Sequence, residues 1–408
     1  MFHDIIVIGG GASGVMASLV AKDMGSDVAI IEHKDRVAKK ILITGNGRCN
    51  ISNNSIDINN YHTNSSKKLI QNVLLNFSLT NTIDFFKSIG LNLTLLDNDK
   101  LYPLSLQASS VVDLLLFSLN DKSIPLYLNT NVINISKKDN KFLIVTNKDE
   151  YSCNKLIIAT GGKSYPKTGS DGSGYKYAKS FKHNIVNPTP AIVQVILDYP
   201  KLKALSGIKF NGTASIFVNK DFIRSEYGEI LFTDYGISGP PILQLSRIIS
   251  RNSNCTIELD MFPNMSSKDL SEFLESHWGI IGYRSILDSF IGIINKKLIP
   301  IFLKDCGIHN IHKPCWEITV DEHNLIINKL KSWKFIATGT KNFDSAQVTS
   351  GGVSLDEINP LTLESTKEKN LFFCGEILDV DGDCGGYNLQ WAWSSGAVAG
   401  KNSSQQKR

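Results

Sequence analysis

The chain has 408 residues, 42% of them hydrophobic and 20% charged, and its 43 basic and 39 acidic side chains leave a formal charge of +4. That length predicts two or three domains rather than one core, and the small charge excess gives no reason to expect a nucleic-acid or membrane partner. The seven cysteines form no Cys-x-x-Cys pair, no apolar run reaches the roughly 18 residues of a membrane span, and a signal peptide is not expected, so a reducing cytoplasm is the expected compartment.

The first predicted element is a buried strand at Ile5–Ile8, followed by the glycine spacing G-x-G-x-x-G and a helix from Val15 to Met24. A second strand, Val28–Ile31, ends at an acidic residue 18 positions after the last of these glycines. The glycines permit a tight turn, the approach of a pyrophosphate and close helix packing, and the acid suits an adenosine ribose. Glycines that served only helix packing would not require the full order of strand, glycines, helix, strand and acid. This order predicts a site for FAD or NAD at Gly9, Gly11, Ala12, Ser13, Gly14 and Glu32.

A glycine- and asparagine-rich loop, Lys39–Asn53, follows the second strand. Such a loop can pass close to a flat ring system, and its alternative interpretation is a surface turn. Arg48 in this loop could bind the pyrimidine edge of a flavin or an anionic substrate, although arginine is more often solvated or paired with phosphate. Cys49 has no partner histidine nearby in the sequence and is expected to be a buried, inert thiol. The candidate cofactor contacts of this loop are Lys40, Asn46, Arg48, Cys49 and Asn50.

Residues 54–125 look mixed and partly helical, and a buried strand, Lys155–Ile158, then runs into Ala-Thr-Gly-Gly, which adds Thr160 and Gly161 to the candidate site. After Pro188 several β-type runs predict an antiparallel sheet or barrel. Residues 267–306 look helical and residues 314–340 mixed. A buried strand returns at Leu371–Glu376 and is followed by a helix rich in small residues up to Lys401.

Six motifs along the chain resemble those of the BaiN-like, or YhiN-like, flavoproteins. These are bacterial NAD(P)/FAD-dependent oxidoreductases that include aminoacetone-oxidase-like members. The motifs occur in the family's order and span nearly the whole chain. They are Gly9–Gly14, Thr44–Asn53, Ala159–Gly174, Gly228–Ser246, Ser350–Val353 and Phe373–Gly396.

The resemblance implies an α/β fold with a Rossmann-like FAD-binding domain of the glutathione-reductase type, built from residues 1–190 and 346–408. A β-barrel-like domain, residues 191–345, is inserted between them and carries a helical subdomain near 265–312. The resemblance also implies that Gly375 and Glu376 hold the ribityl-phosphate arm and that Gly386, Tyr387 and Asn388 begin the last helix under the flavin ring. Asp234 stands where the family usually has histidine, so no role of that histidine is carried over.

These observations predict an FAD-dependent oxidoreductase that transfers a hydride between the flavin and a small organic substrate or NAD(P)H. The FAD is expected to be non-covalent, and NAD(P)H is expected to bind only transiently, because a single dinucleotide fingerprint is present. Two alternatives remain: a non-catalytic or redox-sensing FAD protein and, less favoured by the near-neutral charge, an FAD-dependent RNA-modifying protein. The sequence does not identify the catalytic acid or base, because hydride transfer to a flavin needs positioning more than a strong base. The spacing of Cys306, His309, His312 and Cys315 does not fit a structural zinc motif, so no metal is expected.

Overall fold

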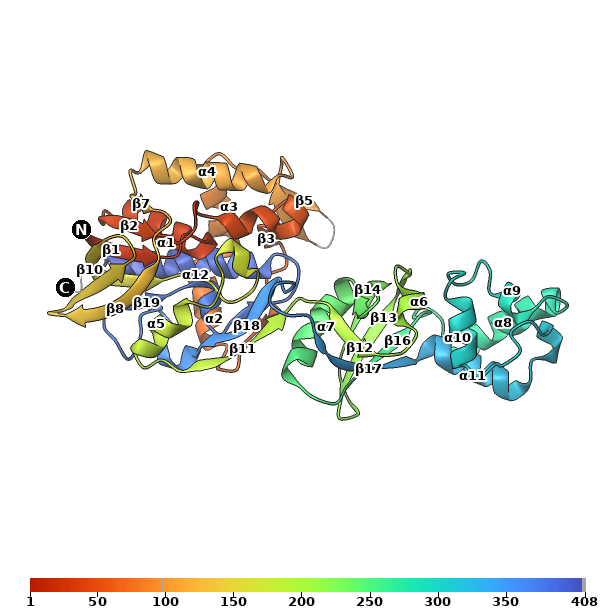
Figure 1. The fold of residues 1–408 in the computed structure, drawn as a ribbon. Helices are drawn as coiled ribbons and strands as arrows, with labels where there is room; N and C mark the ends of the chain where they lie inside the picture. The colour runs from red at the N-terminus through yellow and green to blue at the C-terminus, as the bar shows by residue number, and fades with distance from the viewer. Residues whose placement is uncertain (97–98, 406–408) are drawn as a thin grey trace. The chain divides into compact units, whose positions relative to one another are not determined.

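The structure, a computed structural model, describes residues 1–96 and 99–405. The chain divides into two compact units (Figure 1). The sheet unit consists of Met1–Thr189 and Phe343–Arg408, and the barrel unit of Pro190–Asn342. Each unit has its own cluster of buried apolar side chains. None of the described helices is both long enough and apolar enough to cross a membrane.

A seven-stranded sheet forms the centre of the sheet unit. Its order is β7-β2-β1-β10-β9-β8, and β19 also pairs with β10. The first half of β10 pairs antiparallel with β9 and its last residues pair parallel with β19, so one long strand joins a parallel sheet to an antiparallel hairpin. Parallel strands are covered on both faces, which explains the continuous apolar runs of β1 and β2. The strands are β1 (Phe2–Ile8), β2 (Val28–Ile31), β7 (Leu126–Tyr127), β8 (Val132–Lys138), β9 (Lys141–Thr146), β10 (Glu150–Ile158) and β19 (Leu371–Phe373).

The first and last long helices, α1 (Ala12–Asp23) and α12 (Tyr387–Ser404), pack side by side in the sheet unit (Figure 1). A Cβ atom on Gly396 would lie 2.4 Å from the Ser13 carbonyl oxygen. A Cβ atom on Gly400 would lie 2.3 Å from the Ala17 carbonyl oxygen. The two backbones are therefore closer than any side chain on these positions would permit.

Smaller elements surround this core. Three of the short sheets join distant segments: β3-β6-β5, β4-β20 and β11-β18. The remaining elements of the sheet unit are α2 (Lys68–Asn76), α3 (Leu79–Ser88), α4 (Ala108–Asp121), α5 (Gly174–Ser180), β3 (Ser52–Asn53), β4 (Tyr61–His62), β5 (Leu93–Leu96), β6 (Lys100–Pro103), β11 (Ile185–Ala191), β18 (Val348–Val353), β20 (Asp381–Gly382), and the 3₁₀ turns η1 (Lys39–Gly47), η2 (Ile58–Asn60), η3 (Pro166–Thr168), η5 (Leu355–Glu357) and η6 (Gly375–Ile377).

The barrel unit is a closed six-stranded barrel in the order β12-β15-β14-β13-β16-β17. Its interior is filled by aromatic rings: Trp333 lies 5.9 Å from Phe232, 5.0 Å from Phe335 and 5.8 Å from Phe302, centroid to centroid. Phe302 comes from a helix, so the helical part shares the barrel's core. The strands are β12 (Val195–Asp198), β13 (Lys209–Val218), β14 (Asp221–Phe232), β15 (Gly236–Ser238), β16 (Cys255–Asp260) and β17 (Trp333–Thr340).

The sequence prediction of a Rossmann-type α/β fold with an inserted barrel is confirmed. The helical part extends farther than the periodicity indicated, because α11 occupies a stretch that looks mixed in sequence. The missed signal is a capping box, in which Thr319 and Glu322 each hydrogen-bond the other's backbone N–H. The helices are α6 (Leu202–Leu205), α7 (Pro240–Arg251), α8 (Ser267–Ile281), α9 (Ile286–Ser289), α10 (Ile299–Asp305) and α11 (Val320–Lys331), with the 3₁₀ turn η4 (Cys315–Glu317).

Gly396→Ala is expected to lower the free energy of unfolding by about 1–3 kcal/mol, because the new methyl group meets backbone atoms that cannot move aside. The matched control is Gly279→Ala in α8, where an added Cβ meets nothing within 4 Å, and stability is expected to hold or rise by about 0.5–1 kcal/mol. Urea unfolding followed by circular dichroism measures both. Equal midpoints for Gly396→Ala and the wild type would show that the helices do not pack this closely.

Candidate functional site

Two glycines of the fingerprint are needed for the fold, whether or not a ligand is bound. Gly9 has a φ of +102°, and a Cβ atom on Gly14 would lie 1.9 Å from the Gly9 carbonyl oxygen. Gly11 differs, because a Cβ atom there meets nothing within 4 Å and its φ of −75° suits any residue. The open space lies at the N-terminus of α1, where no side chain caps the free N–H groups. Free N–H groups and open space are what a pyrophosphate needs.

Glu32 lies at the end of β2, buried beside the fingerprint. Its two carboxylate oxygens accept hydrogen bonds from the backbone N–H groups of Gly10 and Lys34, each at 2.8 Å. These bonds fix the carboxylate's orientation. A carboxylate has about four acceptor positions, so Glu32 can still accept from ribose hydroxyls.

A second carboxylate, Glu376, connects three segments that are far apart in sequence. Its Oε2 accepts a hydrogen bond from the Lys40 ammonium at 2.8 Å, and its Oε1 accepts one from the Thr349 N–H at 2.6 Å. The preceding residue, Gly375, has a φ of +79°, and a Cβ atom on it would lie 2.2 Å from Ser13 Oγ. The candidate residues of the first and last motifs are therefore brought together at the start of α1.

Several buried polar side-chain atoms of the sheet unit have no hydrogen-bond partner among the described residues. They include Asn50 Oδ1, Thr160 Oγ1, Ser170 Oγ, Tyr175 Oη and His33 Nε2. A buried polar atom without a partner costs about 1–3 kcal/mol, so these atoms are suited to hydrogen-bond a bound ligand.

Three of these atoms lie close to glycines of the segment Gly161–Gly174. A Cβ atom on Gly174 would lie 1.9 Å from Thr160 Oγ1, one on Gly161 would lie 3.0 Å from Ser170 Oγ, and one on Gly169 would lie 3.6 Å from His33 Nε2. Tyr175 follows Gly174 directly in the chain. The residues present therefore fit a bound dinucleotide.

The loop before α12 is held by its own hydrogen bonds. Asn388 Oδ1 accepts from the Gly382 N–H and its Nδ2 donates to the Gly382 carbonyl, both at 2.8 Å. Tyr387 packs edge-on against Tyr61 at 6.0 Å. Gly386, with a φ of +102°, passes so close to Ser52 that a Cβ atom would lie 2.3 Å from its carbonyl oxygen. The side chains of Tyr387 and Asn388 thus position the N-terminus of α12, which no side chain caps. A ligand could therefore bind the backbone N–H groups of these two residues.

The loop around Arg48 holds two left-handed residues that are not glycine, Asn46 with a φ of +55° and Cys49 with a φ of +59°. Such backbone is uncommon and collects at functional sites. The exposed Arg48 guanidinium lies 5.4 Å above the ring of Tyr102. Tyr102 was not among the sequence candidates, because only the pairing of β6 with β3 brings it to this loop. Burial raises the pKa of the Cys49 thiol to about 12, as expected for an inert cysteine.

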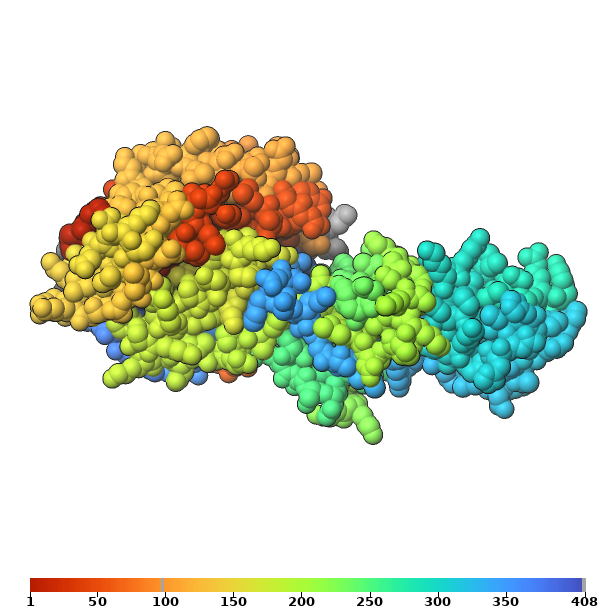
Figure 2. All heavy atoms as spheres, viewed as in Figure 1, coloured from red at the N-terminus to blue at the C-terminus, as the bar shows by residue number. Residues whose placement is uncertain are grey.

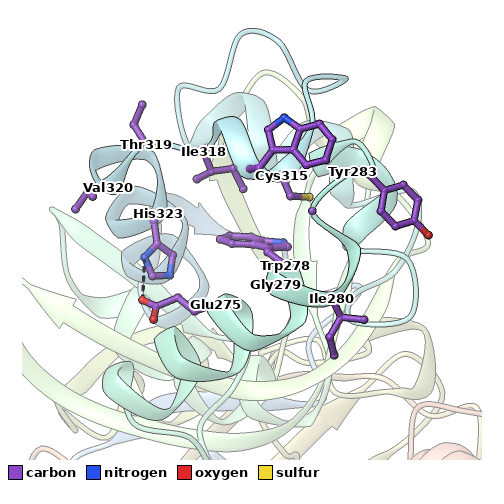
Figure 3. A pocket seen from close by; sticks show the side chains of 12 residues that line it. Glu275, Trp278, Gly279, Ile280, Tyr283, Cys315, Ile318, Thr319, Val320 and His323 are labelled. Atoms are coloured by element: carbon purple, nitrogen blue, oxygen red, sulfur yellow. Dashed lines mark ion pairs between the residues drawn. The ribbon is translucent and has the colours of Figure 1, made fainter.

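A separate cavity of about 560 Å³ lies in the helical part of the barrel unit (Figure 3). Trp278, Tyr283 and Trp316 line it, and His323 and Glu275 form an ion pair of 3.7 Å at its edge. None of the sequence-predicted cofactor residues lines this cavity. Cys315 does, whereas Cys306 is buried at the end of α10. Across residues 1–96 and 99–405 no group of three or more metal-ligating side chains gathers.

The fold and the site define a flavin-dependent oxidoreductase of the Rossmann type. The chain belongs to the family described as HI0933-like protein Rossmann domain, whose model matches residues 3–402. The resemblance inferred from the six motifs is therefore confirmed.

Similar proteins cover nearly the whole chain. It is 36% identical over 402 residues to the 3-dehydro-bile acid delta(4,6)-reductase of Clostridium scindens, which covers 97% of both chains. It is 29% identical over 397 residues to the ribosomal RNA dihydrouridine synthase of Escherichia coli, which covers 96% of both. The fold also resembles that of 3-ketosteroid-delta4-(5alpha)-dehydrogenase from Rhodococcus jostii, with a TM-score of 0.50, 14% identity, and coverage of 99% of this chain and 97% of that one.

Gly11→Val is expected to abolish flavin binding and leave the ligand-free fold intact, because the side chain enters space that no protein atom occupies. The wild type is expected to purify yellow and to release FAD on heating. The flavin-to-protein absorbance ratio measures binding, and circular dichroism of flavin-free protein measures the fold. A yellow Gly11→Val variant with full flavin content would show that the phosphate site lies elsewhere.

Cys49 is expected to resist thiol reagents in the native protein. With a pKa of about 12 its thiolate fraction at pH 8 is about one in ten thousand, and the side chain is buried. Mass spectrometry after alkylation with and without urea measures the labelling. Rapid labelling of Cys49 in the folded protein would contradict this assignment.

Proposed function

We propose that this protein is an FAD-dependent reductase that adds two hydrogens across a carbon–carbon double bond conjugated to a carbonyl group, with NAD(P)H reducing the flavin. The observation that carries the proposal is the open, uncapped N-terminus of α1 at Gly11, in a unit that also holds several buried polar atoms without hydrogen-bond partners among the described residues. The names of the two relatives support the chemistry. A 3-dehydro-delta(4,6) steroid has double bonds in conjugation with its carbonyl, and the double bond that becomes saturated in dihydrouridine is conjugated with a uracil carbonyl.

The proposed cofactor contacts follow the chain's own geometry. Gly9, Gly11, Ala12, Ser13 and Gly14 would hold the pyrophosphate at the start of α1, and Glu32 the adenosine ribose. Thr160 and Gly161, with the Lys40–Glu376 pair and Gly375, would bind the central part of the cofactor. Asn46, Arg48, Cys49 and Asn50, with the backbone of Gly386, Tyr387 and Asn388, would surround the flavin ring. We propose non-covalent binding and transient binding of NAD(P)H.

When bound and reduced by NAD(P)H, the flavin would supply the hydride, and a proton from solvent would supply the second hydrogen. Addition of a hydride to a conjugated double bond leaves negative charge on the carbonyl oxygen. The chain offers two groups that stabilise negative charge, the Arg48 guanidinium and the N-terminus of α12. Both belong to the loops assigned to the flavin ring, so the site favours a reaction in which charge develops on the substrate.

Two substrate classes carry such a bond: a small enone and a uracil base in RNA. The expectation that nucleic acid is no partner depended on net charge alone. The distribution of that charge favours RNA, because residues 163–182 gather five lysines against one carboxylate. The 36% identity to a named reductase argues against a non-catalytic role.

The test uses flavin-loaded protein under anaerobic conditions. NADH or NADPH is expected to bleach the flavin, and a 3-oxo-Δ4 steroid or ribosomal RNA free of dihydrouridine is expected to restore its colour. Mass spectrometry should show a product two hydrogens heavier. Protein that is reduced but reoxidised only by oxygen, with no hydrogenated product from either substrate, would rule out this function.

Arg48→Ala is expected to keep its flavin content but to slow reoxidation of the reduced flavin by the substrate about 100-fold or more, the usual effect of removing one group that stabilises an oxyanion. Arg48→Lys should recover part of the rate, because it retains the charge. Stopped-flow absorbance separates flavin reduction by NAD(P)H, which should not change, from reoxidation. Equal reoxidation rates for Arg48→Ala and the wild type would remove Arg48 from the reaction.

A further inference from the structure

Residues 163–182 of the sheet unit contain five lysines and one carboxylate. The segment includes η3 and α5; α5 is labelled in Figure 1, and the segment belongs to the yellow to yellow-green part of the sheet unit in Figure 2. Lys176 and Lys179 are three residues apart on α5 and therefore lie on the same side of the helix. The five lysines are Lys163, Lys167, Lys176, Lys179 and Lys182. Lys163 is half-buried and the other four are exposed.

None of these five lysines forms an ion pair with a carboxylate of the described residues. Lysines elsewhere in the chain do, as in the pairs Lys137–Glu368 at 2.6 Å and Lys331–Asp260 at 2.7 Å. Two of the five instead place their ammonium groups 4.9 Å from an aromatic ring centroid, Lys163 over Phe343 and Lys176 over Tyr177. The positive charge of this segment is therefore not neutralised within the protein.

The neighbouring groups extend the positive charge. Gly169 lies against the side chain of Lys34, since a Cβ atom there would lie 3.3 Å from Lys34 Cγ. The segment's carboxylate, Asp171, is exposed and lies 4.0 Å from His33 Nε2. Near Lys182, Glu357 is already paired with Lys367. We call the six cations Lys34, Lys163, Lys167, Lys176, Lys179 and Lys182 the lysine surface.

We propose that the lysine surface binds the phosphate backbone of RNA. Several exposed ammonium groups along one segment suit a chain of repeated phosphates better than a single small anion. Large apolar side chains that would insert into a membrane are missing here: no exposed one lies between Leu143 and Phe222. Phosphate contacts position a nucleic acid without reading its sequence, so choice of the base would belong to the flavin site. Naming RNA as substrate rests on the proposed double-bond reduction.

The test is the double variant Lys176→Glu/Lys179→Glu, whose side chains are exposed and form no ion pair within the described part of the chain, so the fold should persist. The control is Lys87→Glu/Lys268→Glu, which changes the net charge equally on α3 and α8. Deproteinised ribosomal RNA is the probe, and filter binding at several KCl concentrations gives Kd. We expect the α5 variant to bind at least 10-fold more weakly than the control, with a salt slope smaller by about 1.5 to 2, as for two lost phosphate contacts.

Flavin content and the reduction of a small enone are measured on the same samples and are expected to be equal in all three proteins. Equal Kd and salt slope for the α5 variant and the control would overturn the proposal, as would wild type that does not bind RNA at low salt. Binding of anionic vesicles or polyglutamate, but not RNA, through the same lysines would also overturn it. Failure of the proposed reductase function would look different: RNA would bind through these lysines while neither substrate is hydrogenated.

Discussion

The close contact between α1 and α12 is the constraint on which the sheet unit depends. Glycines at positions 396 and 400 let the last helix lie against the backbone of the first, so the two ends of the chain form one structure. In the proposed assignment both helix N-termini contribute to the flavin site: α1 begins at the fingerprint and α12 at the loop assigned to the flavin ring. A larger residue at either glycine would separate the helices and with them the two halves of the site.

Long-range polar contacts complete what the helices begin. The Lys40–Glu376 ion pair, the bond from Asn53 Nδ2 to the Gly385 carbonyl and the bond between Ser52 and Gln390 each join residues more than 300 positions apart in the sequence. They connect the Arg48 loop to the C-terminal motif from both sides. Because each contact is buried or partly buried, the two loops are held in a defined arrangement, which a flavin ring and a reacting substrate both require.

Charge in this protein acts through its distribution. A formal charge of +4 over 408 residues gives no hint of a polyanion partner. Many lysines are neutralised by carboxylates, as in the pair Lys313–Glu322, and this leaves the lysine surface as a local excess. Electrostatic attraction to a polyanion depends on such local excess within about a Debye length, roughly 8–10 Å in physiological salt, so net charge is a poor guide to it.

The sequence by itself determined the features that follow from local chemistry. The fingerprint at Gly9–Gly14, the apolar strands and the acid at position 32 follow one another within a short stretch, and their spacing alone predicts the turn, the helix and the nucleotide. The motifs in their order were enough to indicate the family and the inserted barrel. Only the tertiary structure decided what depends on residues far apart: Tyr102 under Arg48, Glu376 between Lys40 and Thr349, and the buried polar atoms without partners. Pairings across hundreds of residues leave no periodic signal in the chain, because they depend on how separate elements pack and not on the residues beside them.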